Sequence, residues 1–372
     1  MTDYHAMTDD RAAMTDYRAA IIGCGRMSRG HAHAYKQLGI PIVAAADISQ
    51  EALDRARTDY GAGQTYTDYV QLLEEVQPEL VSIVTAEALH CEMVVAAAER
   101  GVKGVICEKP MAMNLGEAKR MLDACRASGS VLTISHQRQY NSQYVRAREL
   151  IAEGAIGPVR FAEAYGMAES IHTDGTHTIH MLFSLLGDPK LSYLIAQIDG
   201  NSDYQYFGHR CDQGGNAFLG FENGVYAHLT WGLHTYDPKT RLHPFWDFDK
   251  HFYHAFVVHG ETGRIEVDGD IFTRDREAPA PEIVRIVRGG EVENVEYEWP
   301  MAKSAIALEI EDLIQSIETG APHPLSGENG YAVTEVIMGI YESSRRRGVV
   351  HMPVEVEDNP FLSMVAEGIF PA

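Results

Sequence analysis

A short apolar run that ends in a glycine turn constrains the fold of this chain more than any other feature. The run Ala19–Ile22 leads directly into Gly23 and Gly25, and residues 29–38 have a helical pattern. Gly23 allows a tight turn and Gly25 lets the backbone approach a diphosphate, while amides at the helix start face the anion. Ser28 stands where a third glycine is usual, so the match to the three-glycine pattern is imperfect. It still predicts a strand–turn–helix unit that binds a dinucleotide.

An acidic residue at the end of the next apolar run supports this interpretation. Asp47 closes the run 42–46, about twenty residues after the turn, where a carboxylate can accept hydrogen bonds from a ribose diol. A 2′-phosphate would be repelled there, so NAD is favoured over NADP. We expect Arg26 and Met27, which follow the second glycine, to contact the same cofactor.

The first third of the chain alternates between strand and helix patterns. Such alternation predicts a parallel sheet with helices on both faces, and therefore an α/β Rossmann domain. The expected strands are 41–47, 80–85, 104–108 and 131–135, and the expected helices are 29–38, 49–60, 69–76, 91–100 and 115–128. We predict a disordered tail over residues 1–16, an NAD-binding domain over 17–136 and a substrate and oligomerisation domain over 137–372.

The second domain is rich in short strands. Tight turns such as Glu222–Gly224 are typical of hairpins. The expected strands are 159–166, 193–200, 216–221, 225–232, 255–260, 264–267, 282–287 and 292–299, and the expected helices are 143–153, 304–319 and 330–347. The pattern predicts an α+β domain with a large, mostly antiparallel open sheet. One face would carry helices, and the other would be free for a ligand or for a second subunit in a homodimer or homotetramer.

Charge and composition exclude several classes of partner. The chain has 53 acidic and 31 basic residues, a formal charge of −22, so nucleic acid and anionic membranes would be repelled. No run of roughly 18 apolar residues is present, and the start lacks the pattern of a signal peptide. Five scattered cysteines form no CxxC pair, which indicates reduced thiols. We expect a cytoplasmic protein.

A lysine at the end of the predicted strand 104–108 is the first candidate for a catalytic residue. Lys109 lies between Glu108 and Pro110, and the proline ring restricts the lysine backbone. Such a lysine is a positioned ammonium at the edge where the cofactor is expected, suited to proton exchange with a substrate hydroxyl. The alternative is that Lys109 pairs with Glu108 on the rim of the sheet, and spacing alone does not separate the two.

These motifs together resemble the Gfo/Idh/MocA oxidoreductases, the family of glucose–fructose oxidoreductase and inositol dehydrogenase. The resemblance rests on the glycine turn, Asp47, the segment Thr85–His90, the Glu108–Pro110 element and the strand-rich second half. Ala86 replaces the proline that usually follows the threonine. The resemblance implies a nicotinamide cofactor contacted by Thr85, His90 and Glu108. It also implies a sugar or cyclic polyol as substrate and a catalytic role for Lys109.

The family also has an aspartate four residues before a histidine, and here the match is imperfect. Alignment on Gly175–His177 assigns His177 to the histidine and Thr173 to the aspartate position, with Asp174 adjacent. Alignment on His180 puts Thr176 at the aspartate position. The first alignment fits better, and we expect Lys109, His177 and Asp174 to be catalytic.

Helical periodicity predicts how the histidines are oriented. An apolar stripe faces the core, formed by Ile179, Leu182, Phe183 and Leu186. His177 and His180 then leave the core together, so we predict that His177 is the base and that His180 and Thr173 contact substrate. A solvated surface pair is the alternative. A metal cluster with His172 matches no standard zinc spacing, and no metal is expected.

Two further segments carry polar or aromatic side chains toward the expected cleft. Arg138, Tyr140 and Asn141 follow the predicted strand 131–135. They can donate hydrogen bonds to sugar hydroxyls, or they can belong to a connecting segment that caps the next helix. Residues 241–248 are unusually aromatic and can stack on a sugar ring or contact another subunit.

The sequence therefore predicts an NAD-dependent oxidoreductase that oxidises a secondary alcohol of a sugar, glycoside or cyclitol. Lys109 would polarise the reacting oxygen and His177 would accept its proton. The alternatives are NAD-assisted glycoside processing through a 3-keto sugar and a dinucleotide-binding sensor without turnover.

Overall fold

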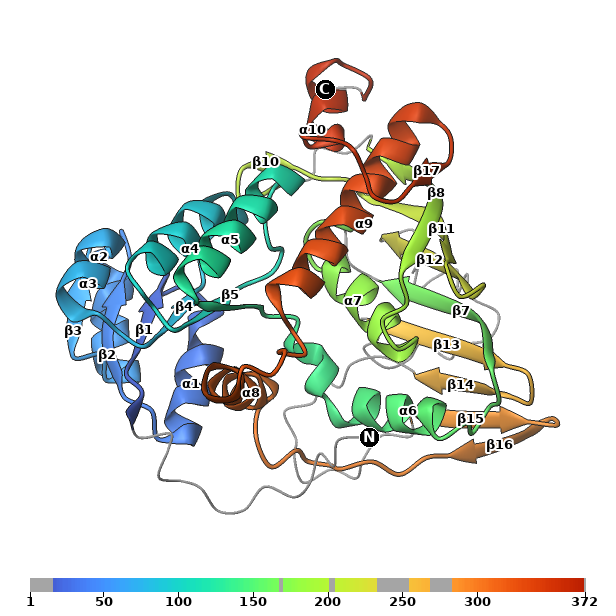
Figure 1. Cartoon of the computed structure of the whole chain (residues 1–372), viewed down its shortest axis with the longest axis horizontal. Coiled ribbons are helices and arrows are strands. Elements are labelled where there is room, and N and C mark those ends of the chain that lie inside the picture. The colour runs from blue at the N-terminus through green and yellow to red at the C-terminus, as the bar shows by residue number, and fades with distance from the viewer. Residues whose placement is uncertain (1–15, 167–169, 201–204, 233–253, 268–282, 371–372) are drawn as a thin grey trace. The chain divides into compact units, whose positions relative to one another are not determined.

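The chain forms two compact units in the computed structural model, which describes residues 16–166, 170–200, 205–232, 254–267 and 283–370 (Figure 1). Unit 1 comprises the described residues of Met1–Glu108, Arg120–Ser135 and Lys303–Gly327. Unit 2 comprises the described residues of Lys109–Lys119, His136–Ala302 and Glu328–Ala372. Unit 1 thus includes a segment, 303–327, that lies far beyond residue 136 in the sequence. Within the described residues, no helix combines the length and apolarity needed to cross a membrane.

Unit 1 contains a parallel six-stranded sheet. The strands are β1 (Ala19–Ile22), β2 (Ile42–Ala46), β3 (Gln64–Tyr66), β4 (Leu80–Ile83), β5 (Gly104–Cys107) and β6 (Val131–Ile134). Their order is β3-β2-β1-β4-β5-β6, and every neighbouring pair is parallel. The predicted Rossmann architecture is therefore confirmed. The short edge strand β3 was not predicted, because three residues are too few to show an alternating pattern.

Helices follow the strands of unit 1 in turn. They are α1 (Ser28–Leu38), α2 (Gln50–Arg55), the π-helical turn η2 (Ala56–Tyr60), α3 (Tyr69–Val76), the 3-10 turn η3 (Glu87–Leu89), α4 (His90–Glu99), α5 (Leu115–Ser128) and α8 (Ala305–Thr319). Side-chain caps start several of them: Ser49 accepts from the Ala52 amide, and Asp68 accepts from the Val70 amide. Leu313 of α8 packs in the same core as Leu80 of β4. This apolar contact explains why α8 belongs to unit 1.

Unit 2 contains a nine-stranded mixed sheet. Its strands are β7 (Val159–Gly166), β8 (Leu191–Asp199), β11 (Gly214–Phe221), β12 (Tyr226–Gly232), β13 (His254–Gly260), β14 (Arg264–Val267), β15 (Val284–Arg288), β16 (Glu291–Asn294) and β17 (Val350–His351). The order is β16-β15-β14-β13-β7-β12-β11-β8-β17, and only β7 and β12 pair in parallel among these described strands. The prediction of a mostly antiparallel second sheet is confirmed. A separate pair joins β9 (Gln205–Tyr206) and β10 (His209–Arg210).

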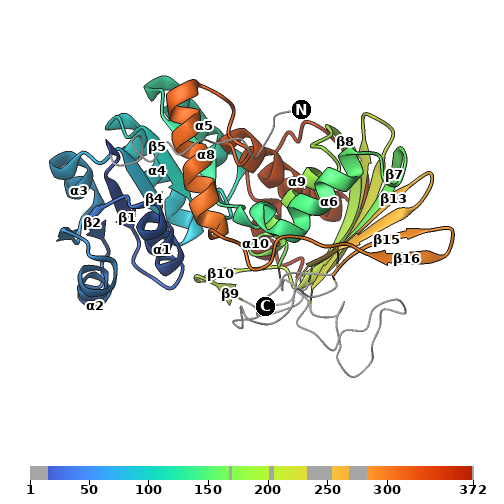
Figure 2. The ribbon, with the colours of Figure 1, turned by 90° about the horizontal axis from the view of Figure 1, so that it is seen from below.

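Helices pack against one face of the unit 2 sheet (Figure 2). They are the 3-10 turn η4 (Gln137–Tyr140), α6 (Ser142–Ala152), α7 (Gly175–Leu185), α9 (Gly327–Arg346) and α10 (Pro360–Ala366). Side chains alternate along β8, so Leu194 and Ala196 are buried in this core while Tyr193 and Ile195 are exposed. Phe218 and Tyr226 add to the exposed face.

Candidate functional site

The glycine turn of unit 1 has the geometry that its sequence predicts. Gly23 has a φ of +91°, and a Cβ there would lie 2.4 Å from the carbonyl oxygen of Val84. Only glycine fits this position. Gly25 differs, because no described heavy atom lies within 4 Å of the place where its Cβ would be. The backbone at Gly25 is therefore open to a ligand.

The start of α1 is suited to bind a diphosphate. Met27 occupies the cap position without a side-chain cap, and no acidic residue lies in the first turn. The Ser28 hydroxyl turns away from the helix amides and donates to the Gly25 carbonyl at 2.6 Å. Arg26 and Met27 are exposed at this end. The amide end of α1 therefore meets the requirements for a dinucleotide phosphate.

Asp47 fixes the turn as well as offering a carboxylate to a ribose. One oxygen accepts from the Cys24 amide at 2.7 Å, and the other accepts from the Ser49 amide at 2.8 Å. Each oxygen retains a second acceptor site for a ribose hydroxyl. Ile48 beside it is 94% exposed, which suits contact with a flat apolar ligand surface. The sequence analysis did not identify Ile48, because one apolar residue after a strand carries no distinctive pattern.

The other residues predicted to contact the cofactor divide into two groups. Thr85 lies against the turn, with its methyl group 2.8 Å from a Cβ placed on Gly23, and its carbonyl bonds to His90 Nε2 at 3.2 Å. Glu108 instead points into unit 1, where it is buried and pairs with His31 Nε2 at 3.0 Å. The carboxylate of Glu108 is thus engaged inside the protein, and its predicted contact with the cofactor stays a prediction.

Unit 2 holds the predicted catalytic lysine in an ion pair. The Lys109 ammonium contacts the Asp174 carboxylate, and their side chains are 11% and 35% exposed. The alternative in which Lys109 pairs with Glu108 is wrong. Asp174 immediately precedes α7, so the helix start positions the carboxylate that holds the ammonium.

The prediction that one face of α7 leaves the core is wrong. Every residue of α7 except Ser184 is buried, including His177 and His180. The apolar stripe faces the core as expected, but other elements cover the opposite face, since α7 contacts η4 and α6 as well as β7 and β13. Periodicity located the histidines on one side without revealing that this side is covered.

Four imidazoles cluster around this covered face. His136 stacks on His180, with ring centroids 4.7 Å apart and planes 9° apart, and meets His177 edge-on at 5.6 Å. The ring of His254 lies 6.2 Å from that of His177, and its Nδ1 bonds to the Thr178 hydroxyl at 2.7 Å. His136 lies two residues after the end of β6, and His254 is the first residue of β13. The sequence analysis assigned neither histidine to the site.

The imidazoles of this cluster are neutral at neutral pH. Burial lowers the pKa of His136, His177 and His254 well below the ordinary value, and the nearby Lys109 ammonium lowers each pKa further. Burial also lowers the pKa of His180 to about 3. A neutral imidazole has one ring nitrogen that accepts a hydrogen bond.

Several ring nitrogens of the cluster have room for another partner. Within the part of the chain that the structure describes, His136 Nε2, His177 Nδ1 and His180 Nδ1 are buried without a hydrogen-bond partner. A buried polar atom without a partner is costly, so these nitrogens suit a ligand hydroxyl or an ordered water. The described residues contain no group of three or more His, Cys, Asp or Glu side chains placed to hold a metal ion.

The remaining predicted substrate residues lie in two segments. The Thr173 hydroxyl is buried and donates to the Ser170 carbonyl at 3.3 Å, so it is engaged within its own turn. Arg138 lies close enough to lower the pKa of His177 by its charge. Tyr140 is buried, and Asn141 precedes α6 without capping it through its side chain. The aromatic segment 241–248 lies outside the described residues.

The fold and the turn are those of a dinucleotide-binding Rossmann domain, and sequence comparison agrees. Residues 17–136 match a profile described as an oxidoreductase family with an NAD-binding Rossmann fold. Residues 166–354 match the C-terminal alpha/beta domain of the same family. The chain belongs to the Gfo/Idh/MocA oxidoreductase family, as its motifs predicted.

Similar curated proteins match only part of the chain. It is 34% identical over 142 residues to D-apiose dehydrogenase of Paraburkholderia graminis, and 28% identical over 141 residues to myo-inositol 2-dehydrogenase of Thermotoga maritima. Each alignment covers 38% of this chain, and it covers 38% and 42% of the respective relatives.

Solved structures resemble the chain over a longer span. Levoglucosan dehydrogenase in complex with NADH aligns with a TM-score of 0.74 at 20% identity, covering 91% of this chain and 99% of that one. Aldose-aldose oxidoreductase from Caulobacter crescentus aligns with a TM-score of 0.74 at 21% identity, covering 90% and 99%. At this identity the likeness establishes the shared fold.

Proposed function

We propose that this protein is an NAD-dependent dehydrogenase that oxidises a secondary alcohol of a sugar, glycoside or cyclitol. The observation that carries the proposal is the ion pair between Lys109 and Asp174 beside a cluster of neutral imidazoles. The relatives named as apiose, inositol and levoglucosan dehydrogenases support the substrate class. NAD is favoured over NADP because the Asp47 carboxylate would repel a 2′-phosphate.

Lys109 polarises the reacting oxygen in this proposal. Its ammonium donates a hydrogen bond to the carbinol oxygen and stabilises the negative charge that develops there. Asp174 is a positioning residue that holds the ammonium in one place, so little reorganisation is needed during the reaction. Bound NAD would supply the hydride acceptor.

His177 accepts the hydroxyl proton. Its imidazole is neutral because burial and the nearby cations of Arg138 and Lys109 lower its pKa, so an acceptor nitrogen is available across the neutral pH range. The unpartnered nitrogen of His136 supports contact with a further hydroxyl group of a polyol.

The central experiment measures NADH absorbance with a panel of sugars, glycosides and cyclitols, first with NAD and then with NADP. Lys109→Ala should lower kcat by orders of magnitude while NAD binding, followed by protein fluorescence, persists. Lys36→Ala is the matched control, because Lys36 is exposed on α1. Unchanged turnover in the Lys109 variant would remove that residue from the mechanism.

Product analysis separates the alternatives. Accumulation of a keto sugar together with free NADH supports simple oxidation, whereas a cleaved glycoside without net NADH supports glycoside processing through a 3-keto sugar. Failure of the whole panel to reduce NAD would favour a sensor without turnover.

We also propose that the exposed face of the unit 2 sheet binds a second copy of the chain. Tyr193, Ile195, Phe218 and Tyr226 are 37–44% exposed on β8, β11 and β12, which are neighbours in the sheet. The Phe218 and Tyr226 rings stack with centroids 5.5 Å apart. Exposed apolar surface of this kind is typical of subunit interfaces.

A further inference from the structure

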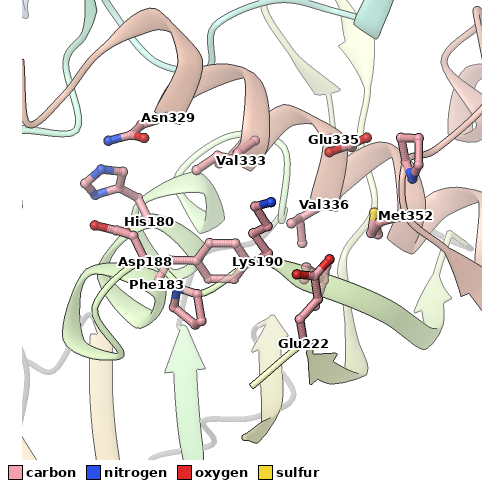
Figure 3. A pocket seen from close by; sticks show the side chains of 14 residues that line it. His180, Phe183, Asp188, Lys190, Glu222, Asn329, Val333, Glu335, Val336 and Met352 are labelled. Atoms are coloured by element: carbon pink, nitrogen blue, oxygen red, sulfur yellow. The ribbon is translucent and has the colours of Figure 1, made fainter. Parts of the chain in front are cut away.

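Unit 2 contains a pocket that the proposed reaction does not use. It has a volume of about 340 Å³ and opens between the end of α7, the start of β8 and α9 (Figure 3). Its floor is apolar and its rim is polar. The floor consists of Phe183, Pro189, Leu191, Ala332, Val333, Val336, Met352 and Pro353, and the rim consists of His180, Asp188, Lys190, Glu222, Asn329 and Glu335.

The pocket lies at the far end of α7 from the ion pair. Asp174 immediately precedes the helix, whereas Asp188 follows its last residue by three positions. The first and last of the eleven residues are ten rises of 1.5 Å apart, or about 15 Å. Asp188 and the Lys109–Asp174 pair therefore lie at opposite ends of α7, and His180 of the pocket lining lies between them.

The charges around the pocket favour a cation. Three carboxylates, those of Asp188, Glu222 and Glu335, line the pocket together with one ammonium, that of Lys190. The guanidinium of Arg148, which is not part of the lining, offsets part of the charge of Asp188. Burial raises the pKa of Glu335, and its hydrogen bond from the Val354 amide offsets only part of this effect. A bound cation would supply further compensation.

A buried ring nitrogen adds a second and independent indication of a ligand. His180 lines the pocket, is only 3% exposed, and has no hydrogen-bond partner for Nδ1 among the described residues. Figure 3 shows its ring beside Asn329 and Asp188 at one end of the pocket. A ligand with polar hydrogens can satisfy this nitrogen while its apolar part covers Phe183 and Val333.

We propose that this pocket binds a small organic cation, a primary amine with a compact apolar body. The ammonium would lie among the carboxylates and the apolar body on the floor. His180 would take or give one hydrogen bond at Nδ1. Since His180 stacks on His136, the ligand would contact the imidazole cluster from the side opposite the ion pair. The strongly acidic chain would also attract a cation.

Isothermal titration calorimetry of the full chain with cyclohexylamine tests the proposal. Cyclohexanol serves as the uncharged probe of the same shape. We expect cyclohexylamine to bind in a 1:1 ratio and cyclohexanol to bind at least about tenfold more weakly. Equal binding of the two probes, or no binding of the amine, would overturn the proposal. Dehydrogenase activity is not the readout, so failure of the proposed function leaves this test intact.

Variants locate the bound amine. Glu335→Gln should weaken amine binding about tenfold, because it removes one carboxylate. Glu335 also accepts from the Val354 amide at 3.0 Å, so Glu222→Gln on the exposed hairpin serves as a second variant that leaves the core untouched. Glu355→Gln, an exposed carboxylate outside the pocket, is the matched control. Equal affinity in all three variants would refute the location.

Discussion

The buried imidazole of His180 makes the stability of unit 2 depend on pH, and its substitution should remove a defined part of that dependence. In the folded chain burial lowers the pKa of His180 to about 3, whereas the ordinary value is 6.5. As pH falls below 6.5, the unfolded chain binds a proton at this ring and the folded chain does not. The free energy of unfolding therefore falls as pH falls, and the contribution is fully present only above that value.

The magnitude follows from linkage. One proton bound only by the unfolded state changes the free energy of unfolding by about 1.4 kcal/mol per pH unit. Between about pH 7.5 and 5.5, His180 accounts for a loss of about 1.4 kcal/mol, because its unfolded form titrates only in the lower half of this range. His136, His177 and His254 shift in the same direction, so the wild-type chain should lose more than this amount.

His180→Gln lacks this titration. The variant is destabilised at both pH values by lost packing, but its deficit relative to the wild type should be about 1.4 kcal/mol smaller at pH 5.5 than at 7.5. Urea unfolding followed by tryptophan fluorescence, to which Trp231 in the core of unit 2 contributes, measures both proteins. Glu309 shifts in the opposite direction, since burial raises its pKa to about 7, but it belongs to unit 1.

The control is His351→Gln, because this histidine is exposed at β17 of the same unit. Its deficit at the two pH values is the reference for a histidine on the surface of the same unit. A deficit of His180→Gln that is equally large at pH 5.5 and 7.5 would refute the assignment of a buried neutral ring at position 180.

Three further predictions address the site and the sheet face. Asp174→Asn should lower kcat about a hundredfold with little change in NAD binding, because Lys109 loses the carboxylate that positions it. Thr173→Val is the control and should leave kcat unchanged, and steady-state kinetics measures both variants. Asp47→Ala should raise the KM for NAD and reduce the preference for NAD over NADP in the same assay, since the carboxylate both fixes the turn and faces the ribose. Phe218→Glu should shift the molecular mass from light scattering toward that of a monomer, and an unchanged mass would exclude this face as the interface.

The sequence predicted the fold well where local patterns and tertiary structure agree. The glycine turn, the apolar strand β4 and the hairpin at Glu222–Gly224 each carry a signal within a few residues, and the structure confirms each of them. The assignment of α8 to unit 1 could not be predicted in this way. Its amphipathic pattern says that one face is buried but not which sheet covers it, and its partners β4 and β5 lie some two hundred residues earlier in the chain.

The candidate site shows the same limit at the level of single side chains. Lys109 was singled out by its place at the end of a strand before Pro110, and Asp174 by the family resemblance, as the carboxylate next to the expected aspartate position; the structure brings the two into an ion pair. The interpretation of α7 failed because periodicity divides a helix into faces by polarity, and an imidazole counts as polar whether or not it is solvated. Here His136, two residues after β6, and His254 of β13 cover the polar face with further imidazoles. Burial first, and then the charges of Arg138 and Lys109, keep the His177 ring neutral, and His136 and His254 add smaller effects in the same direction.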